Sequence, residues 1–134
     1  MATKRTFLAQ PQSARFCRRW VQEQAERSFH DTDRIRAIGL ATSELVTNAI
    51  EHGTNATFSV QVLDTDRSFA IAVSSVSNLA DPLAAIGAWS MSNAHQASGR
   101  GLAIVRACSD DVQVNIKLPE VTVRCSFRHE AKAP

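Results

Sequence analysis

The spacing of apolar residues along the chain changes from segment to segment, and each spacing predicts an element. A short apolar stretch at residues 6–9 predicts a first strand. After Pro11, which suits a helix start, apolar residues recur at helical spacing to about Phe29. A polar turn follows, and a second helix is predicted from about Asp33 to His52. Two amphipathic helices therefore lie near the start of the chain.

Alternation of apolar and polar residues replaces the helical spacing after residue 53. Residues 57–62 and 69–73 alternate on either side of a polar turn, which predicts a hairpin with one buried face. The alternation at 112–118 and 121–127 predicts a second hairpin. Between the hairpins lie an irregular stretch at about 79–98 and a glycine turn that enters a third helix.

This order of elements mixes helices and hairpins without a regular strand–helix–strand alternation. It predicts an α+β fold in which about three helices pack on one face of a mixed, largely antiparallel sheet. At 134 residues, the chain is expected to form one domain, 1–134. A loop as long as 79–98 is expected to be functional or disordered, and the polar tail from residue 129 is expected to be disordered.

Composition narrows the class of protein. The hydrophobic fraction of 44% and the charged fraction of 21% are ordinary for a soluble globular domain. No segment approaches the roughly 20 apolar residues that a membrane span needs, and the first ten residues lack the apolar core of a signal peptide. A cytoplasmic protein is therefore expected. The net charge of +2 is too small to argue for direct binding of nucleic acid. The three widely spaced cysteines are predicted to be free thiols.

The run at residues 44–53 is the strongest chemical signal. Glu44, Asn48 and His52 are four residues apart, so they project from one face of the second helix. A carboxylate and an amide stacked in this way offer two oxygen ligands to a hydrated divalent cation and its phosphates. The alternative is an ordinary amphipathic helix with a solvated polar face. Thr47 and Asn48 are poor interior helix formers, which counts against that alternative.

The second constellation is the run Gly99-Arg100-Gly101-Leu102. Two glycines allow backbone N–H groups to approach a phosphate closely, and the following helix adds the positive end of its dipole. Arg100 could add a charge-assisted contact or point into solvent. A glycine turn of this kind is by itself a weak motif, because it is more often required by packing.

The run Glu44-Leu-Val-Thr-Asn48-Ala-Ile-Glu-His52-Gly53 resembles the N-box of the GHKL ATPase superfamily, and it is most similar to the small bacterial anti-sigma factors that are also serine kinases. The resemblance implies a Bergerat fold, a two-layer α/β sandwich that binds ATP and Mg²⁺ between its helices and a lid, here about 79–98. It implies that Glu44 is the catalytic base and that Asn48 binds Mg²⁺. The nucleotide phosphates are expected at Gly99, Arg100, Gly101 and Leu102.

The chain departs from this family where an aspartate, followed two residues later by a glycine, accepts a hydrogen bond from the adenine amino group. Asn78 takes the aspartate position if the middle strand runs to its apparent end, and Ser75 takes it if the strand ends earlier. Asn78 is our candidate adenine contact, the alternative being that it merely ends the strand. Thr122 aligns loosely with a nucleotide contact on the last hairpin, although Pro119-Glu120 replaces the family's glycine.

The resemblance implies an ATP-binding anti-sigma factor and protein serine kinase that phosphorylates an anti-sigma factor antagonist and so regulates transcription by partner switching. The sigma factor or antagonist would bind the first helices, where Arg15, Arg18 and Arg19 are the candidates; a solvated helix face is the competing interpretation. The alternative function is a binding module that holds a partner with weak or no nucleotide binding. A third is a detached ATPase domain of a histidine kinase or repair ATPase. Homodimers are common in the family, but no pattern here identifies an interface.

Overall fold

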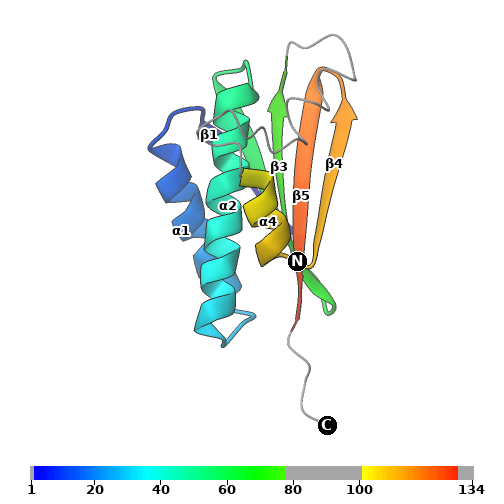
Figure 1. Cartoon of the computed structure of the whole chain (residues 1–134). Helices are drawn as coiled ribbons and strands as arrows, with labels where there is room; N and C mark the ends of the chain where they lie inside the picture. Colours follow the sequence, from blue (N-terminus) through cyan, green and yellow to red (C-terminus); the bar gives the residue numbers. More distant parts are fainter. Residues whose placement is uncertain (1, 78–100, 130–134) are drawn as a thin grey trace.

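The computed structural model describes residues 2–77 and 101–129, and for Gly101 and Leu102 it describes the backbone alone. Within these ranges, three helices cover one face of a five-stranded sheet (Figure 1). The elements in chain order are β1 (Ala2–Leu8), α1 (Ser13–Ala25), α2 (Thr32–His52), β2 (Thr57–Asp64), β3 (Ser68–Val76), α4 (Gly101–Cys108), β4 (Asp111–Lys117) and β5 (Glu120–Arg128). This arrangement confirms the predicted α+β sandwich, and all the described strand pairs are antiparallel.

The strand order is β1-β2-β3-β5-β4, so the last strand of the chain is more central than the one before it. Burial explains this order. In β5, alternate residues from Val121 to Phe127 are buried, whereas the corresponding residues of β4 are only half-buried. The strand with the more apolar face therefore lies next to β3, and β4 becomes an edge.

Two boundaries differ from the sequence-based expectations. The first strand begins at Ala2 rather than near residue 6, because its backbone pairs with β2 along its whole length although Phe7 is its only buried side chain. The first helix ends at Ala25 rather than near Phe29. The chain then turns, and the Ser28 hydroxyl donates a hydrogen bond to Asp64 of the β2–β3 hairpin.

The core lies between the sheet and the helices. Phe29, just after α1, meets Phe69 of β3 edge to face, with ring centroids 5.8 Å apart. Both rings are buried, together with Leu45 of α2 and Phe127 of β5. The opposite face of the sheet is polar: hydroxyl and amide side chains lie in register across all five strands at Thr6, Ser59, Ser74, Thr122 and Asn115.

The two long helices approach closely at Gly39. A Cβ atom at this position would lie 2.2 Å from Gln22 Nε2 on α1. The same Nε2 donates a hydrogen bond to the carbonyl of Ile35, 3.4 Å away. Glycine thus gives Gln22 the space to bridge the two helices.

Part of the expected lid and tail can be compared with the structure. The expected lid at 79–98 and residues 130–134 of the expected tail lie outside the described residues, whereas His129 Nε2 lies 2.8 Å from Asp64 Oδ1. The three cysteines are free thiols, as predicted, and burial raises the pKa of Cys17 and of Cys125 to about 12. In the described part of the chain, no helix has the length and apolar character needed to cross a membrane.

The aromatic contact at the centre of the core leads to a stability prediction. We expect Phe69→Ala to lower the free energy of unfolding by about 3–5 kcal/mol, because it leaves a cavity beneath Phe29. Phe16→Ala is the matched control, since Phe16 is 61% exposed, and its effect should stay within about 0.5 kcal/mol. Urea unfolding followed by circular dichroism measures both, and equal effects would contradict this account of the core.

Candidate functional site

Helix α2 positions the site. At its start, the Asp31 side chain accepts a hydrogen bond from the backbone N–H of Asp33, 2.9 Å away. Along its length, Leu45, Val46 and Ala49 are buried in the core. Because these residues fix the rotation of the helix, Glu44 and Asn48 must project from another face, about 6 Å apart along the axis.

Asn48 is buried although it is polar. It is 6% exposed, so its packed surroundings on α2 hold the side chain in place. An amide oxygen held in this way can serve as a ligand to a divalent cation. The side chain is thus held ready to bind.

Glu44, one turn earlier, is half-buried. Burial raises the pKa of its carboxyl group, and the nearby negative charge of Glu51 raises it further. None of the ion pairs found in the described ranges involves Glu44. A carboxylate with a raised pKa and no neutralising cation is suited to accept a proton near neutral pH.

The C-terminal end of α2 lies against the end of β3. A Cβ atom at Gly53 would lie 2.5 Å from the carbonyl oxygen of Ala49 and 3.3 Å from Ser75 Cβ. The backbone of Gly53 is extended, with φ of −74°, so close packing rather than a left-handed conformation requires glycine here. The next residue, Thr54, donates its backbone N–H to the carbonyl of Val76, at 2.7 Å. The loop after α2 is therefore fastened to the end of β3.

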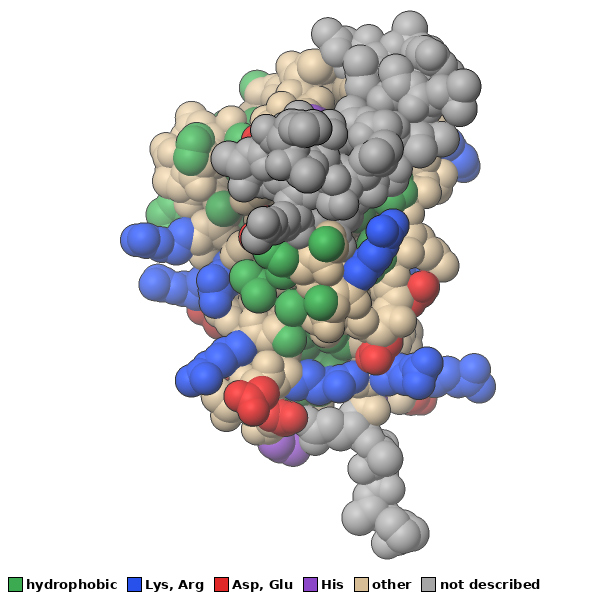
Figure 2. Space-filling view, in the orientation of Figure 1, with side chains coloured by type: hydrophobic (Ala, Val, Ile, Leu, Met, Phe, Trp, Pro, Cys, Tyr) green, Lys and Arg blue, Asp and Glu red, His purple; other side chains and the backbone are tan. Residues whose placement is uncertain are grey.

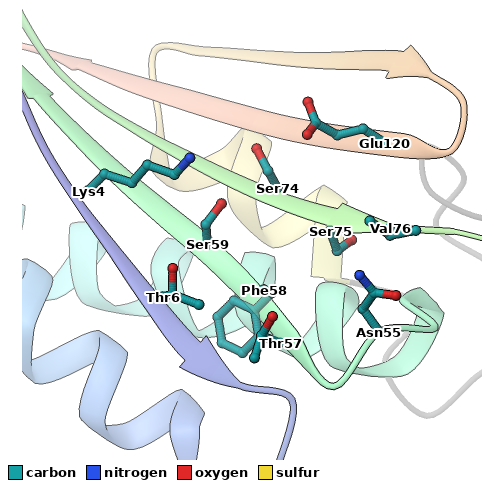
Figure 3. A pocket seen from close by; sticks show the side chains of 10 residues that line it. All are labelled: Lys4, Thr6, Asn55, Thr57, Phe58, Ser59, Ser74, Ser75, Val76 and Glu120. Atoms are coloured by element: carbon teal, nitrogen blue, oxygen red, sulfur yellow. The ribbon is translucent and has the colours of Figure 1, made fainter.

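Ser75 lies at this junction and faces the helices, in phase with the buried Ile71 and Val73. It is 5% exposed, and its hydroxyl has no hydrogen-bond partner in the described part of the chain. Figure 3 shows it beside Val76, with Asn55 of the loop after α2 nearby. The sequence leaves Asn78 and Ser75 as alternatives for the position at which related proteins have the aspartate that contacts adenine. Because β3 ends at Val76, the strand reaches Ser75 and stops before Asn78, which lies outside the described residues.

The phosphate-binding candidates are described only in part. Gly99 and Arg100 lie outside the described residues, while Gly101 and Leu102 form the start of α4, for which the backbone alone is described. Helix α4 packs beside α2 (Figure 1). The start of the third helix was predicted correctly, and it belongs to the same layer as Glu44 and Asn48.

Thr122 is not brought together with Glu44 and Asn48. Its hydroxyl lies 2.8 Å from the Ser74 hydroxyl, on the polar face of the sheet that points away from the helices. The pocket drawn in Figure 3 lies on this same face, where Lys4, Ser59 and Ser74 line it. Ser75, Val76 and Asn55 also line it, so the pocket extends to the end of β3, whereas Glu44 and Asn48 are not among its lining residues.

The arginine candidates lie on α1. Arg15 and Arg19 are exposed, and Arg18 is half-buried, with its Nε facing Gly39 of α2. Figure 2 shows basic side chains on the side of the molecule on which α1 lies and also across its lower part toward the opposite edge. Phe16, between these arginines, is exposed as well.

Sequence reasoning missed two features of the site. The close approach of Gly53 to Ser75 joins segments 22 positions apart, so the sequence gives no direct sign of it. The unpartnered Ser75 hydroxyl had a weak signal, because a serine takes an apolar position in the alternation of β3. In the described ranges, no group of three or more His, Cys, Asp or Glu side chains could hold a metal ion.

Comparisons with known proteins show the family and the fold. The sequence model of the histidine kinase-like ATPase domain family matches residues 7–126. The fold is similar to the crystal structure of the RsbU and RsbW domains of Rv1364c from Mycobacterium tuberculosis, with a TM-score of 0.72 and 21% sequence identity. The match covers 99% of this chain and 34% of the other, so this chain spans about a third of that protein's length. A search of curated proteins found no match.

The raised pKa of Glu44 leads to a prediction about stability and pH. A carboxyl group whose pKa is higher in the folded than in the unfolded chain stabilises the fold below its ordinary pKa of 4.5, and this contribution is lost as the pH rises through the raised pKa. We therefore expect wild type to lose stability relative to Glu44→Gln as the pH rises from 4.5 across that window.

Urea midpoints measured at a series of pH values test this expectation. Glu51→Gln should move the loss of stability to lower pH, because it removes a negative charge that raises the pKa of Glu44. The matched control is Glu23→Gln on the exposed face of α1. If Glu44→Gln and Glu23→Gln gave the same pH profile, the burial of Glu44 would not be the cause.

Proposed function

Because the chain belongs to the histidine kinase-like ATPase domain family, we propose that it is an ATP-binding anti-sigma factor that is also a protein serine kinase. Its substrate would be a serine hydroxyl on an anti-sigma factor antagonist, and the exchange of partners would regulate transcription. The observation that carries this proposal is the buried Asn48 amide one helical turn from the half-buried carboxylate of Glu44.

The residues of the site fit Mg-ATP. The Asn48 amide supplies a single uncharged oxygen, which suits a magnesium ion that keeps several waters and takes its other ligands from phosphates. When bound, magnesium neutralises the charge that develops on the transferred phosphoryl group. Backbone N–H groups at Gly99 and Gly101, together with Arg100 and Leu102, would hold the phosphates before α4.

Glu44 has the chemistry of the base in this proposal. Phosphoryl transfer depends mainly on positioning and charge neutralisation, so the base needs only to orient the serine hydroxyl and accept its proton. Burial raises the pKa of the Glu44 carboxyl group toward neutrality, which suits a group that accepts a proton. A water molecule in place of the serine would lead to hydrolysis instead.

The partner surface that we propose is the exposed side of α1. Arg15, Arg19 and the apolar ring of Phe16 are all exposed on α1, and the Nε of Arg18 lies toward Gly39 of α2. An exposed aromatic ring flanked by arginines is a common composition for protein–protein contacts. Such a surface would favour an acidic segment of a sigma factor or of an antagonist.

The second candidate function is a binding module that holds a partner with weak or no nucleotide binding. The observation that favours it is the absence of a carboxylate at either Ser75 or Asn78, where the family places its adenine-binding aspartate. A neutral acceptor forms weaker hydrogen bonds than a carboxylate does. Glu44 argues for the kinase, since a module gains nothing from a positioned base.

Titration calorimetry with Mg-ATP distinguishes the two functions. We expect wild type to bind with a Kd of about 1 μM, and Asn48→Ala to lose binding by at least about tenfold, because the magnesium ligand is removed. Asn115→Ala is the matched control, since Asn115 lies on the opposite face of the sheet. Absence of binding by wild type would leave the module as the function.

A transfer assay tests the base. We expect Glu44→Ala to bind Mg-ATP as wild type does but to transfer phosphate about 10²–10⁴-fold more slowly to a candidate antagonist protein. Glu51→Gln serves as the control, because it changes a side chain near Glu44 but leaves the Glu44 carboxylate in place. It should keep most of the activity. Release of inorganic phosphate, measured in parallel, separates hydrolysis from transfer. Undiminished transfer by Glu44→Ala would show that another group accepts the proton.

A further inference from the structure

One edge of the sheet, the outer side of β1, is open. This strand is the first in the order β1-β2-β3-β5-β4, so among the described residues it pairs with β2 on one side and with no strand on the other. All of its residues except Phe7 are exposed. Figure 3 shows Lys4 and Thr6 on this outermost strand. An edge of this kind carries backbone groups that can pair with a further strand.

The hydrogen-bonding register shows which residues of β1 present these groups. Just beyond the strand, the backbone N–H of Ala9 donates to the carbonyl of Ala56, at 2.8 Å, whereas the carbonyl of Leu8 accepts a bond from the following turn. Successive residues of a strand direct their N–H and C=O groups to opposite sides, so the even-numbered residues of β1 face away from β2. Lys4 and Thr6 therefore present their backbone groups at the open edge.

Two basic side chains flank the open edge, one on each face of the sheet. Lys4 lies on the polar face and lines the pocket of Figure 3. Arg5 lies on the helix face, where its guanidinium carbon is 5.3 Å from the ring centroid of Phe7 and 6.0 Å from that of Trp20. These cation–π contacts orient an exposed arginine. Because β1 contains no acidic residue, the edge is positively charged on both faces.

Apolar side chains lie near the C-terminal end of the same edge, again on both faces. Leu8 ends β1 on the polar face and is 55% exposed. On the helix face, the rings of Phe7 and Trp20 are 6.0 Å apart, and the exposed ring of Phe16 lies one turn before Trp20 on α1. A strand added to β1 would thus find a basic half and an apolar half along its length.

The charge of β1 decides which strand this edge can take. A second copy of the chain, paired antiparallel along the whole of β1, would place Arg5 directly opposite the same residue of the other copy. Like charges opposite one another in a strand pair are destabilising, and lysine on an edge strand is a common means of preventing such self-pairing. An acidic strand is favoured instead, because each of its carboxylates meets a cation.

We propose that the open edge of β1 binds an extended acidic segment of a partner protein by strand addition. The added strand is antiparallel, as every described pair of the sheet is. Its residues opposite Leu8 and Phe7 are apolar. Those opposite Arg5 and Lys4 are acidic, and one residue lies between the two pairs. The segment therefore reads apolar, apolar, any, acidic, acidic in chain order. This site is additional to the proposed kinase function and needs no nucleotide.

Fluorescence polarisation with a labelled peptide of about nine residues that carries this pattern tests the proposal. We expect wild type to bind it with a Kd below about 100 μM, and to bind a peptide with lysines in place of the acidic residues at least about tenfold more weakly. Lys4→Glu should weaken binding of the acidic peptide and restore binding of a peptide with lysine opposite position 4. The matched control is Arg124→Glu, a charge reversal at an exposed residue of an inner strand.

Thr6→Pro tests the backbone bonds directly. Proline removes the N–H group that faces the open edge, and the pairing of β1 with β2 does not use this group. The fold should therefore tolerate the change, while binding of the acidic peptide weakens by at least about tenfold. Thr6→Ala is the matched control, because it removes the hydroxyl but keeps the N–H group, and it should bind as wild type does. Circular dichroism checks the fold of both variants.

N-methylated peptides give the same test on wild type, without relying on a variant that folds. Methylation of the peptide nitrogen opposite Thr6 blocks a bond to the open edge and should weaken binding by at least about tenfold. Methylation of the nitrogen opposite Phe7 should have little effect, because that N–H group points away from β1.

Each outcome bears on the proposal. It would be overturned if wild type did not bind the acidic peptide, or if Thr6→Pro and Thr6→Ala bound it equally. A wild-type dimer in sedimentation velocity that Thr6→Pro converts to a monomer would show that a second copy occupies the edge instead. Peptide binding by a wild-type protein that does not bind Mg-ATP would contradict the proposed function and support the site on β1.

Discussion

The packing of α2 against the sheet is the constraint on which the rest of the structure depends. Leu45, Val46 and Ala49 are buried, and their contacts fix the rotation of a helix that also carries Glu44 and Asn48. One face of the helix cannot turn without exposing the core, so the other face is held still without any need for polar contacts to orient it. The same hydrophobic packing that stabilises the fold therefore positions the chemistry, and the site needs no rigid loop to support it.

Hydrophobic periodicity was enough to predict the elements and their layers. The second helix and both hairpins follow from patterns that are local in sequence, because each element must bury one face. The strand order could not be predicted in this way, since the place of β5 beside β3 depends on how deeply two similar strands are buried. For the site, spacing placed Glu44 and Asn48 on one helix face. The burial of Ser75 beside Gly53 depends on tertiary contact, which no local pattern encodes.

Two buried polar atoms without partners set a limit on the stability of the described part of the chain. Arg34 Nε and Ser75 Oγ each lose hydration on folding and gain no hydrogen bond among the described residues. This loss is tolerated because the aromatic and aliphatic core is continuous around them. A ligand that supplies the missing bonds binds only the folded state, so it stabilises the fold by mass action. Stability and binding would therefore be coupled at any such atom that a ligand reaches.

Basic and acidic side chains lie in different parts of the helical layer. The arginines of α1 lie on the outer side of the helical layer, and no ion pair between them and Glu44 is found in the described ranges. A cation beside Glu44 would lower the pKa of its carboxyl group and weaken it as a base. Glu51 has the opposite effect, because its negative charge raises that pKa. Under the proposed function, the basic residues lie on a partner surface on α1 and an acidic neighbour lies near the base on α2, and each charge would impair the other site if the two were exchanged.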